Sequence, residues 1–229
     1  MQFSHHSSVR EQFPQLAVAT MTLDAVTPDT DTTATAAPFL ARASARLADR
    51  SESELPEIAA WRRAFSRMGL KPTQYRCASE ALLRRLRTHG ELPRVHPLVD
   101  LCNAVSVAYA IPIAVLDLDQ VVGDLIVTPA AGTETYQSFS GETETPEPDE
   151  IIFRDDAGNA HARRWTNRQS ALSAIRPGTR RVLIVVEALH DTAAGDVEAL
   201  RAELAGALGS HGWSGPGGQQ VPHGPIPRR

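Results

Sequence analysis

Hydrophobic positions along the chain are grouped into extended runs and helical stripes. Runs of apolar and β-branched residues bounded by turn residues predict strands over residues 15–23, 113–118, 121–130, 133–139 and 181–189. The last run is the strongest candidate for a central strand because it is apolar almost throughout. Two alternating runs separated by a Gly-Asn pair predict a β-hairpin over residues 150–165.

Apolar residues at intervals of three and four predict helices over residues 39–47, 55–68, 74–90, 97–109 and 197–208. Gly90 suits the left-handed position that ends a helix, and Pro112 requires that the preceding helix has already stopped. Residues 166–178 are expected to be a loop that runs into a short helix. Because helices and strands come in blocks rather than in strict alternation, the pattern favours the α+β class.

The chain of 229 residues is long enough for one large domain. Its composition predicts a flexible N-terminus over residues 1–14, a single domain over residues 15–209 and a disordered Gly/Pro-rich tail over residues 210–229. No apolar run reaches membrane-spanning length, no signal-peptide core is present, and the two cysteines lack metal-ligand spacing. We therefore expect a soluble, cytoplasmic protein without membrane contact, metal or cofactor.

The net charge of −4 at pH 7 argues against indiscriminate binding of nucleic acid, DNA included. Charge is nevertheless segregated, since residues 62–94 hold nine basic residues against two acids, and residues 161–181 hold six arginines and no acid. Residues 134–156 hold eight acids against one arginine. Lys71 is the only lysine, so nearly all the positive charge is guanidinium, which binds phosphate or carboxylate in a bidentate manner.

Familiar catalytic motifs are absent from the sequence, among them GxSxG, HExxH, GxGxxG and the P-loop. One polar residue is unusual for its surroundings: Asn103 lies in the middle of the almost entirely apolar segment 97–112. Burying an amide without partners costs about 1–3 kcal/mol. Either a neighbouring group satisfies Asn103 as part of the core, or the side chain faces a ligand.

The order of motifs resembles a known family. The segment "SEALLRRLRTHGELPRVHPLVDLCNAVSVAYAIPIAVLDLDQVVGDLIV", followed by the hairpin and "RRWTNRQSALSAI", is similar to the B3/B4 domain of the phenylalanyl-tRNA synthetase β subunit and to free-standing B3/B4 proteins. The resemblance covers residues 15–189, and its most specific parts are residues 76–85, 97–103 with 112–119, and 165–170. It implies a β-sandwich of unusual topology flanked by helices. It also implies editing activity, the hydrolysis of mischarged tRNA that a synthetase has released.

Two positions depart from the synthetase pattern. After the asparagine helix that pattern has a histidine two residues beyond the proline, and Ala114 stands there in this chain. The stretch "TNRQS" matches the segment in which the synthetase has a glutamate before a serine, which places Gln169 at the position of that carboxylate. The resemblance therefore implies a different substrate from the tyrosine that the synthetase pocket rejects.

The resemblance and the charge pattern together select the candidate site residues. They are Glu80 and Asn103 for catalysis, Ser79, Asp124, Asn167 and Gln169 for substrate binding, and Arg76, Arg84 and Arg168 for tRNA binding. A carboxylate such as that of Glu80 suits the α-ammonium of an aminoacyl ester, and guanidinium groups suit tRNA phosphates.

Some of these residues keep a structural alternative. Glu80 with Arg76 and Arg84 can form an ion-pair ladder at i, i+4 and i+8 on a helix surface. Asp124 suits a bulge or hairpin as well as a pocket. Trp165 is expected in the core more than stacked on a terminal adenosine.

The leading hypothesis is a trans-editing deacylase. Water attacks the ester carbonyl, activated by Glu80 or by the substrate's own ribose hydroxyl, while Asn103 or backbone amides stabilise the oxyanion. Glu80 and Asp124 favour a polar or cationic amino acid, such as the arginine analogue canavanine. The alternatives are a non-catalytic tRNA- or amino-acid-binding module of the same fold, and a small-molecule hydrolase or binding protein with no RNA partner. Salt-dependent tRNA binding separates the first two from the third, and turnover separates the first from the second.

Overall fold

A computed structural model describes residues 1–24, 26–213 and 215. Within these ranges the strands form three sheets. The largest contains β1 (Phe3–His5), β4 (Leu125–Pro129), β7 (Ile151–Asp155), β8 (Ala160–Arg163) and β9 (Arg168–Gln169), in that order. A three-stranded antiparallel sheet has the order β2 (Ala17–Leu23), β10 (Val182–Ala188) and β3 (Ile113–Asp117), and the small hairpin comprises β5 (Tyr136–Gln137) and β6 (Thr143–Glu144).

The described helices are α1 (Ser7–Gln12), α2 (Thr33–Arg46), α3 (Pro56–Arg67), α4 (Ala78–His89), α5 (Pro97–Tyr109) and α6 (Ala193–Gly209), with short 3-10 turns at Glu52–Glu54 and Leu118–Gln120. Helices and strands are segregated in space, which confirms the predicted α+β class. Within the described ranges, no helix combines the length and apolar character that crossing a bilayer requires.

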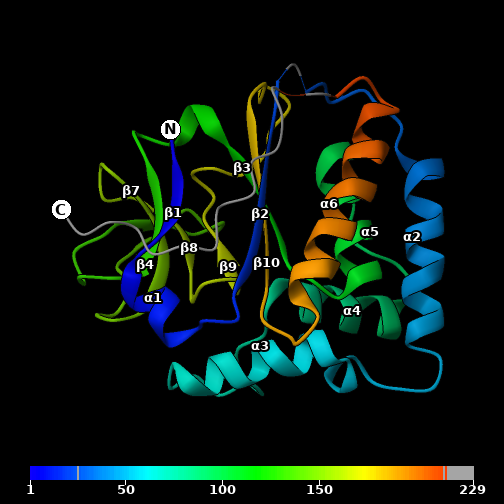
Figure 1. The fold of residues 1–229 in the computed structure, drawn as a ribbon. Coiled ribbons are helices and arrows are strands. Elements are labelled where there is room, and N and C mark those ends of the chain that lie inside the picture. The colour runs from blue at the N-terminus through cyan, green and yellow to red at the C-terminus, as the bar shows by residue number, and fades with distance from the viewer. Residues whose placement is uncertain (25, 214, 216–229) are drawn as a thin grey trace.

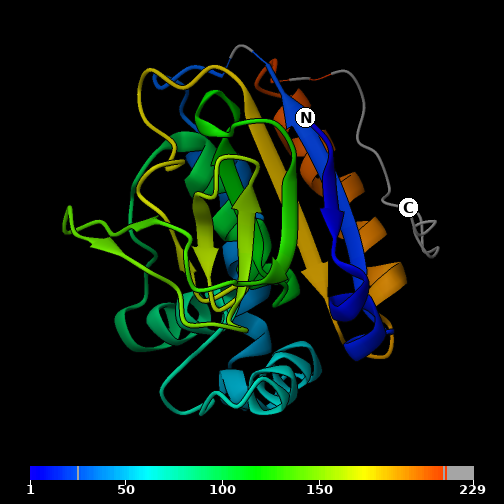
Figure 2. The same ribbon diagram turned by 90° about the vertical axis from the view of Figure 1, so that its left-hand side faces the viewer.

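The three-stranded sheet lies in the middle of the molecule (Figure 1). The five-stranded sheet lies on one side of it, helices α2, α5 and α6 lie on the other, and α3 and α4 cross below (Figure 1). Figure 2 looks onto the five-stranded sheet, with α3 and α4 along its lower edge. The central sheet is thus covered on both faces.

All seven residues of the central strand β10 are buried, as its apolar sequence predicts. Leu183 and Val185 join the core shared with the five-stranded sheet, α3 and α4, whereas Ile184 and Val186 join the core beneath α5 and α6. This alternation follows from the two-residue period of a strand. It directs the one charged residue of β10, Glu187, toward the five-stranded sheet.

Helix α5 is fixed at both ends. His96 is the N-cap, and its Nδ1 accepts from the backbone N–H of Leu98. The helix ends at Ala110 with φ of 57°, and the Ser106 hydroxyl donates to the carbonyl oxygen of Ile111 across 2.7 Å. The predicted stop before Pro112 is therefore observed.

Residues 1–14, expected to be flexible, are part of the fold. Strand β1 pairs in parallel with β4, α1 follows it, and Phe13 is 1% exposed. Strand β1 is too short to show a strand by periodicity. It forms a strand because β4 supplies its backbone hydrogen-bond partners.

Two further segments differ from expectation. Helix α2 begins at Thr33 rather than at residue 39 and contains Pro38. Within the extra length Ala36 is buried in the same core as the apolar residues of α5. Residues 166–178 form β9 and turns instead of a short helix, because their backbone pairs with β8 and with the free edge of β3, where the Asp117 N–H donates to Ser173. Most of the predicted tail 210–229 lies outside the described residues, although Trp213 is buried against the α6 core.

Candidate functional site

A strained turn between β8 and β9 carries several of the predicted site residues. Arg164 and Trp165 both have positive φ, at 47° and 58°, a conformation that is costly for bulky side chains. Trp165 holds the turn in place because its ring is fully buried, with ring centroids of Phe13 and Trp61 at 5.0 and 4.9 Å. Its indole Nε1–H donates to Glu187 Oε1 across 3.0 Å. Burial places Trp165 in the core and removes it as a stacking surface for adenosine.

The residues after this turn dock onto the beginning of α4. The N–H of Ala78 donates to the Thr166 carbonyl oxygen across 2.8 Å, and the Asn167 Nδ2 donates to the Arg76 carbonyl oxygen across 2.7 Å. Ser79, fully buried, donates to the Ala110 carbonyl oxygen across 3.1 Å. Asn167 and Ser79 therefore join the loop, α4 and the end of α5, and both side chains serve these joints.

Gln169 connects the same loop to the central sheet. Its Nε2 donates to the carbonyl oxygen of Val115 in β3 across 2.7 Å, and it also lies 3.5 Å from the Ser173 carbonyl oxygen. Val115 follows Ala114, which is half-buried. The fold thus places Gln169 in contact with the residue that follows Ala114, so the two segments that depart from the synthetase pattern meet.

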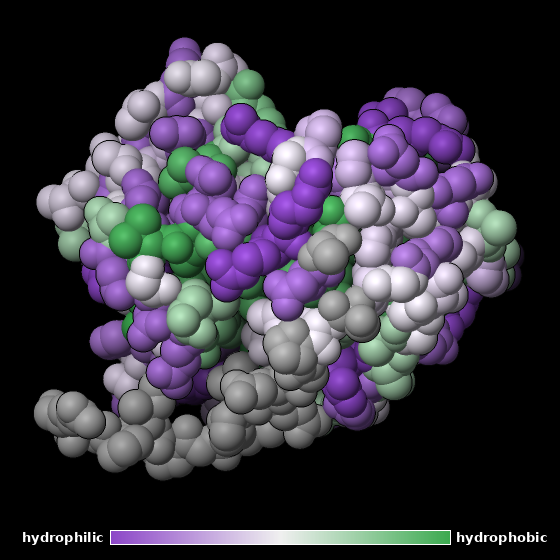
Figure 3. Space-filling view, turned by 90° about the horizontal axis from the view of Figure 1, so that it is seen from above, coloured by the Kyte–Doolittle hydropathy of each residue, from purple (hydrophilic) through white to green (hydrophobic). Residues whose placement is uncertain are grey.

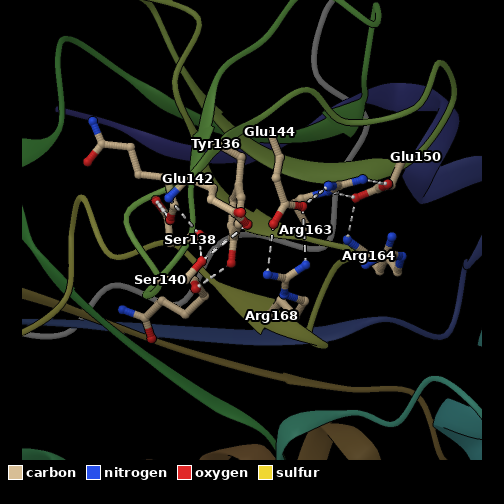
Figure 4. A network of polar contacts seen from close by, with 12 residues as sticks. Tyr136, Ser138, Ser140, Glu142, Glu144, Glu150, Arg163, Arg164 and Arg168 are labelled. Carbon is tan, nitrogen blue, oxygen red and sulfur yellow. Dashed lines mark hydrogen bonds and ion pairs between the residues drawn. The ribbon is translucent and has the colours of Figure 1, made fainter.

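A pocket of about 380 Å³ opens beside Gln169. It is lined by Tyr136, Ser138, Phe139, Ser140, Arg168 and Gln169. The Tyr136 hydroxyl donates to the Gln169 carbonyl oxygen across 2.8 Å, which fixes the β5–β6 hairpin against β9. Figure 4 shows Tyr136, Ser138, Ser140 and Arg168 close together in this region. The lining offers hydroxyl groups, one guanidinium and aromatic rings.

Alternating charges border this pocket (Figure 4). Glu144 accepts from Arg168 at 3.0 and 3.2 Å and from Arg163 at 2.5 Å, and Arg163 also binds Glu150 at 2.7 and 2.8 Å. Hydrogen bonding from Arg168 lowers the pKa of Glu144. Burial opposes ionisation of Glu150, but the guanidinium of Arg163 outweighs it and lowers the pKa of that carboxyl. The carboxylates and guanidinium groups of this ion-pair network are therefore all ionised at neutral pH.

Glu80 is buried rather than facing the pocket. It is 1% exposed and binds Arg62 at 2.5 Å, with Arg76 at 3.7 Å. Burial raises its pKa even though both arginines oppose the shift, and its Oε2 has no hydrogen-bond partner among the described residues. The predicted Arg76–Glu80 pair of the helix ladder exists, whereas Arg84 instead binds Glu52 at 3.7 Å.

The other candidates are more dispersed. Asn103 is half-buried on α5, and its side chain makes no hydrogen bond with any described residue. Asp124 is exposed before β4 and accepts from the Gln2 N–H across 2.6 Å. It lies three strands away from β9 in the five-stranded sheet, so the fold does not bring it to the pocket. Arg168 alone of the three predicted tRNA-binding arginines lines the pocket.

Four pocket residues were missed by the sequence reasoning: Tyr136, Ser138, Phe139 and Ser140. The stretch "YQSFS" was visible as a short strand candidate before an acidic loop. Its hydroxyl and aromatic content was the available sign, but only the pairing of β5 with β6 and the contact with Gln169 turn it into a pocket wall. No group of three or more potential ligand side chains among the described residues could hold a metal ion.

The sequence matches the B3/4 domain over residues 60–199, more than half of the chain. The chain belongs to the B3/4 domain family. Its structure is similar to the crystal structure of an N-terminal fragment of the phenylalanyl-tRNA synthetase beta-subunit from Pyrococcus horikoshii, with a TM-score of 0.51 at 11% identity. The match covers 93% of this chain and 49% of that structure, so this B3/4 protein spans about half its length. At this identity the likeness concerns the fold. Curated protein sequences give no significant match.

Proposed function

We propose that this B3/4 domain protein is a trans-editing deacylase that hydrolyses the ester of a mischarged aminoacyl-tRNA. One observation carries the proposal: Gln169 binds the Val115 carbonyl oxygen, so the two segments that the family resemblance assigns to the editing pocket are in contact. The two residues are 54 positions apart in the chain. A pocket of a size suited to a small ligand opens beside Gln169.

The reaction needs few protein groups. The oxygen of a water molecule attacks the ester carbonyl carbon, and the bond from that carbon to the ribose oxygen breaks. The amino acid leaves as a carboxylate, the ribose regains its hydroxyl and one proton passes to solvent. A neighbouring ribose hydroxyl of the substrate can position and activate the water, and protein donors stabilise the oxyanion.

Asn103 is the protein donor that we propose for the oxyanion on the ground of the family resemblance, since its side chain does not line the pocket beside Gln169. Its amide is half-buried and makes no hydrogen bond with the described residues, so it can donate to a ligand without breaking an existing bond. Glu80 is a positioning residue, because its carboxylate is enclosed and holds Arg76, whose carbonyl oxygen accepts from Asn167. Water activation is therefore assigned to the substrate and not to Glu80.

A polar amino acid is the proposed non-cognate group. Glu80 and Asp124 were the acidic residues that favoured a cationic amino acid as substrate. Glu80 is enclosed by arginines, and Asp124 lies three strands away from β9, so neither acts in the pocket. The pocket is lined instead by Ser138 and Ser140, whose hydroxyls lie 2.7 Å apart. These groups can exchange hydrogen bonds with a hydroxyl or amide side chain.

A non-catalytic tRNA- or amino-acid-binding module is the second candidate. It is favoured by the chemistry at the two departing positions, because neither the Ala114 methyl nor the Gln169 amide can transfer a proton. Gln169 moreover uses its Nε2 to bind the main chain of β3.

The test is deacylation of a panel of correctly and wrongly charged tRNAs covering all twenty amino acids, including tRNA carrying arginine or canavanine. We expect release of one wrong polar amino acid, slowed about tenfold or more by Asn103→Ala. The matched control is Gln120→Ala, an exposed amide elsewhere. Tight tRNA binding without hydrolysis on the panel would leave the binding module, and the absence of tRNA binding would leave a protein without an RNA partner.

A further inference from the structure

Among the phenylalanine, tyrosine and tryptophan residues, all of which lie in the described part of the chain, Phe139 alone is exposed. Its side chain is 73% exposed, whereas the others are buried or half-buried. It lies in the turn between β5 and β6 and lines the pocket beside Gln169. Single exposed apolar residues are common on protein surfaces, so the position of this ring, at the mouth of a pocket, is what matters.

The turn that carries Phe139 is held by its own hydrogen bonds. The Ser138 N–H donates to the Glu142 carbonyl oxygen across 2.9 Å, the Gly141 N–H donates to Ser138 across 3.1 Å, and the Ser138 and Ser140 hydroxyls are 2.7 Å apart. Gly141 has φ of 88°, which favours glycine. The ring is therefore displayed on an ordered turn, not on a loose one.

The hairpin is also fixed relative to the rest of the pocket. The Ser170 hydroxyl and the Ala171 N–H both donate to the Gln137 carbonyl oxygen, across 3.0 and 2.9 Å. The guanidinium of Arg168 lies 5.2 Å from the centroid of the Tyr136 ring. The pocket thus combines a presented ring, Phe139, with the guanidinium of Arg168, a pairing that suits a flat base joined to a phosphate.

Arg168 can turn to a phosphate without leaving a carboxylate unpaired. Its present partner Glu144 also binds Arg163 at 2.5 Å. Arg163 is 4% exposed and stays in place through Glu150. When Arg168 leaves Glu144 for a phosphate, Glu144 therefore keeps Arg163 as its cationic partner, which reduces the free-energy cost of the change.

We infer that Phe139 is the stacking platform for the terminal nucleobase of a tRNA 3′ end, with Arg168 binding the phosphate beside it. The inference rests on the proposed function and adds to it the residues that seat the RNA end. Trp165, the ring that the sequence offered for this role, is fully buried. Phe139 and Arg168 line the same pocket, and the end of a tRNA offers both a flat base for the ring and a phosphate for the guanidinium.

The experiment is a thermodynamic cycle on uncharged tRNA, so that it does not depend on hydrolysis. Affinity is measured for tRNA with a complete 3′ end and for the same tRNA lacking its terminal adenosine. We expect the wild-type protein to lose about tenfold in affinity on truncation. Phe139→Ala should bind both tRNAs with the same reduced affinity, and Phe139→Trp should restore the difference. Val95→Ala, an exposed aliphatic residue elsewhere, is the matched control.

An undiminished truncation effect in Phe139→Ala overturns the inference, as does the absence of tRNA binding. A change from dimer to monomer in Phe139→Ala, seen by sedimentation, would also overturn it, because the ring would then be covered by a second copy of the chain. Loss of the truncation effect in a protein that hydrolyses no charged tRNA would support the inference while removing the deacylase proposal. The failures of the two proposals are therefore distinguishable.

Discussion

The side-chain amide of Gln169 donates to the carbonyl oxygen of Val115 across 2.7 Å, joining the end of the five-stranded sheet to the edge of the central one. A carboxylate at this position would face that carbonyl oxygen with a second acceptor. The residue is therefore both part of the pocket wall and a structural link between two sheets. This double role leads to the first prediction.

Gln169→Glu should lower the free energy of unfolding by about 1–3 kcal/mol, because a donor is replaced by an acceptor facing the Val115 carbonyl oxygen. Urea unfolding measures the change. Gln137→Glu is the matched control, since that amide is exposed on the adjoining hairpin and should shift stability little. Equal effects of the two changes would mean that the link does not stabilise the fold.

Glu187→Ala should cost about 3–5 kcal/mol. Its Oε1 accepts from Trp165 and lies 2.6 Å from His5 Nε2, and all three side chains are buried. Removal leaves two polar groups without their partner and loosens the strained turn. Glu203→Ala, which breaks an exposed pair with Arg42, should cost less than about 1 kcal/mol in the same urea titration. A comparable loss in both variants would contradict this assignment.

Stability should fall as the pH drops below about 6.5. Burial lowers the pKa of His161, although Asp155 opposes the shift, so the unfolded chain binds this proton at a higher pH than the folded one. Hydrogen bonds that outweigh burial also lower the pKa of Asp155, which removes further stability at lower pH. The free energy of unfolding, measured from pH 7.5 to 5, should fall less steeply in His161→Gln.

The matched control for this titration is His89→Gln, because His89 is exposed on α4. It should retain the wild-type slope between pH 7.5 and 5. An unchanged slope in His161→Gln would show that other groups, such as the buried His96, account for the pH dependence.

Arg84→Gln should weaken tRNA binding severalfold and lower the slope of log affinity against log salt by about 1, if Arg84 contacts one phosphate. Its side chain is 53% exposed and lies 3.7 Å from Glu52, so it remains accessible. Arg201→Gln, on α6, removes an equal charge and should leave the slope unchanged. Figure 3 shows the upper face of the molecule, away from α3 and α4, as mainly hydrophilic with smaller hydrophobic areas. Identical slopes for the two variants would place the RNA elsewhere.

The sequence by itself determined the elements whose pattern is local. The apolar run of β10, the stop of α5 before Pro112 and the α+β class follow from periodicity and backbone geometry, which neighbouring residues impose on one another. The family could also be inferred, because it rests on the order of motifs along the chain.

Tertiary structure alone decided which polar side chains meet. Glu80 and Asn103 looked equally available in the sequence, but α3 supplies Arg62 to enclose Glu80, while Asn103 keeps a free amide among the described residues. Asp124 is separated from the pocket by strand order, and Phe139 is presented by a hairpin whose partners come from β9. Contacts between distant segments carry no local periodicity, so they appear only once the chain has packed.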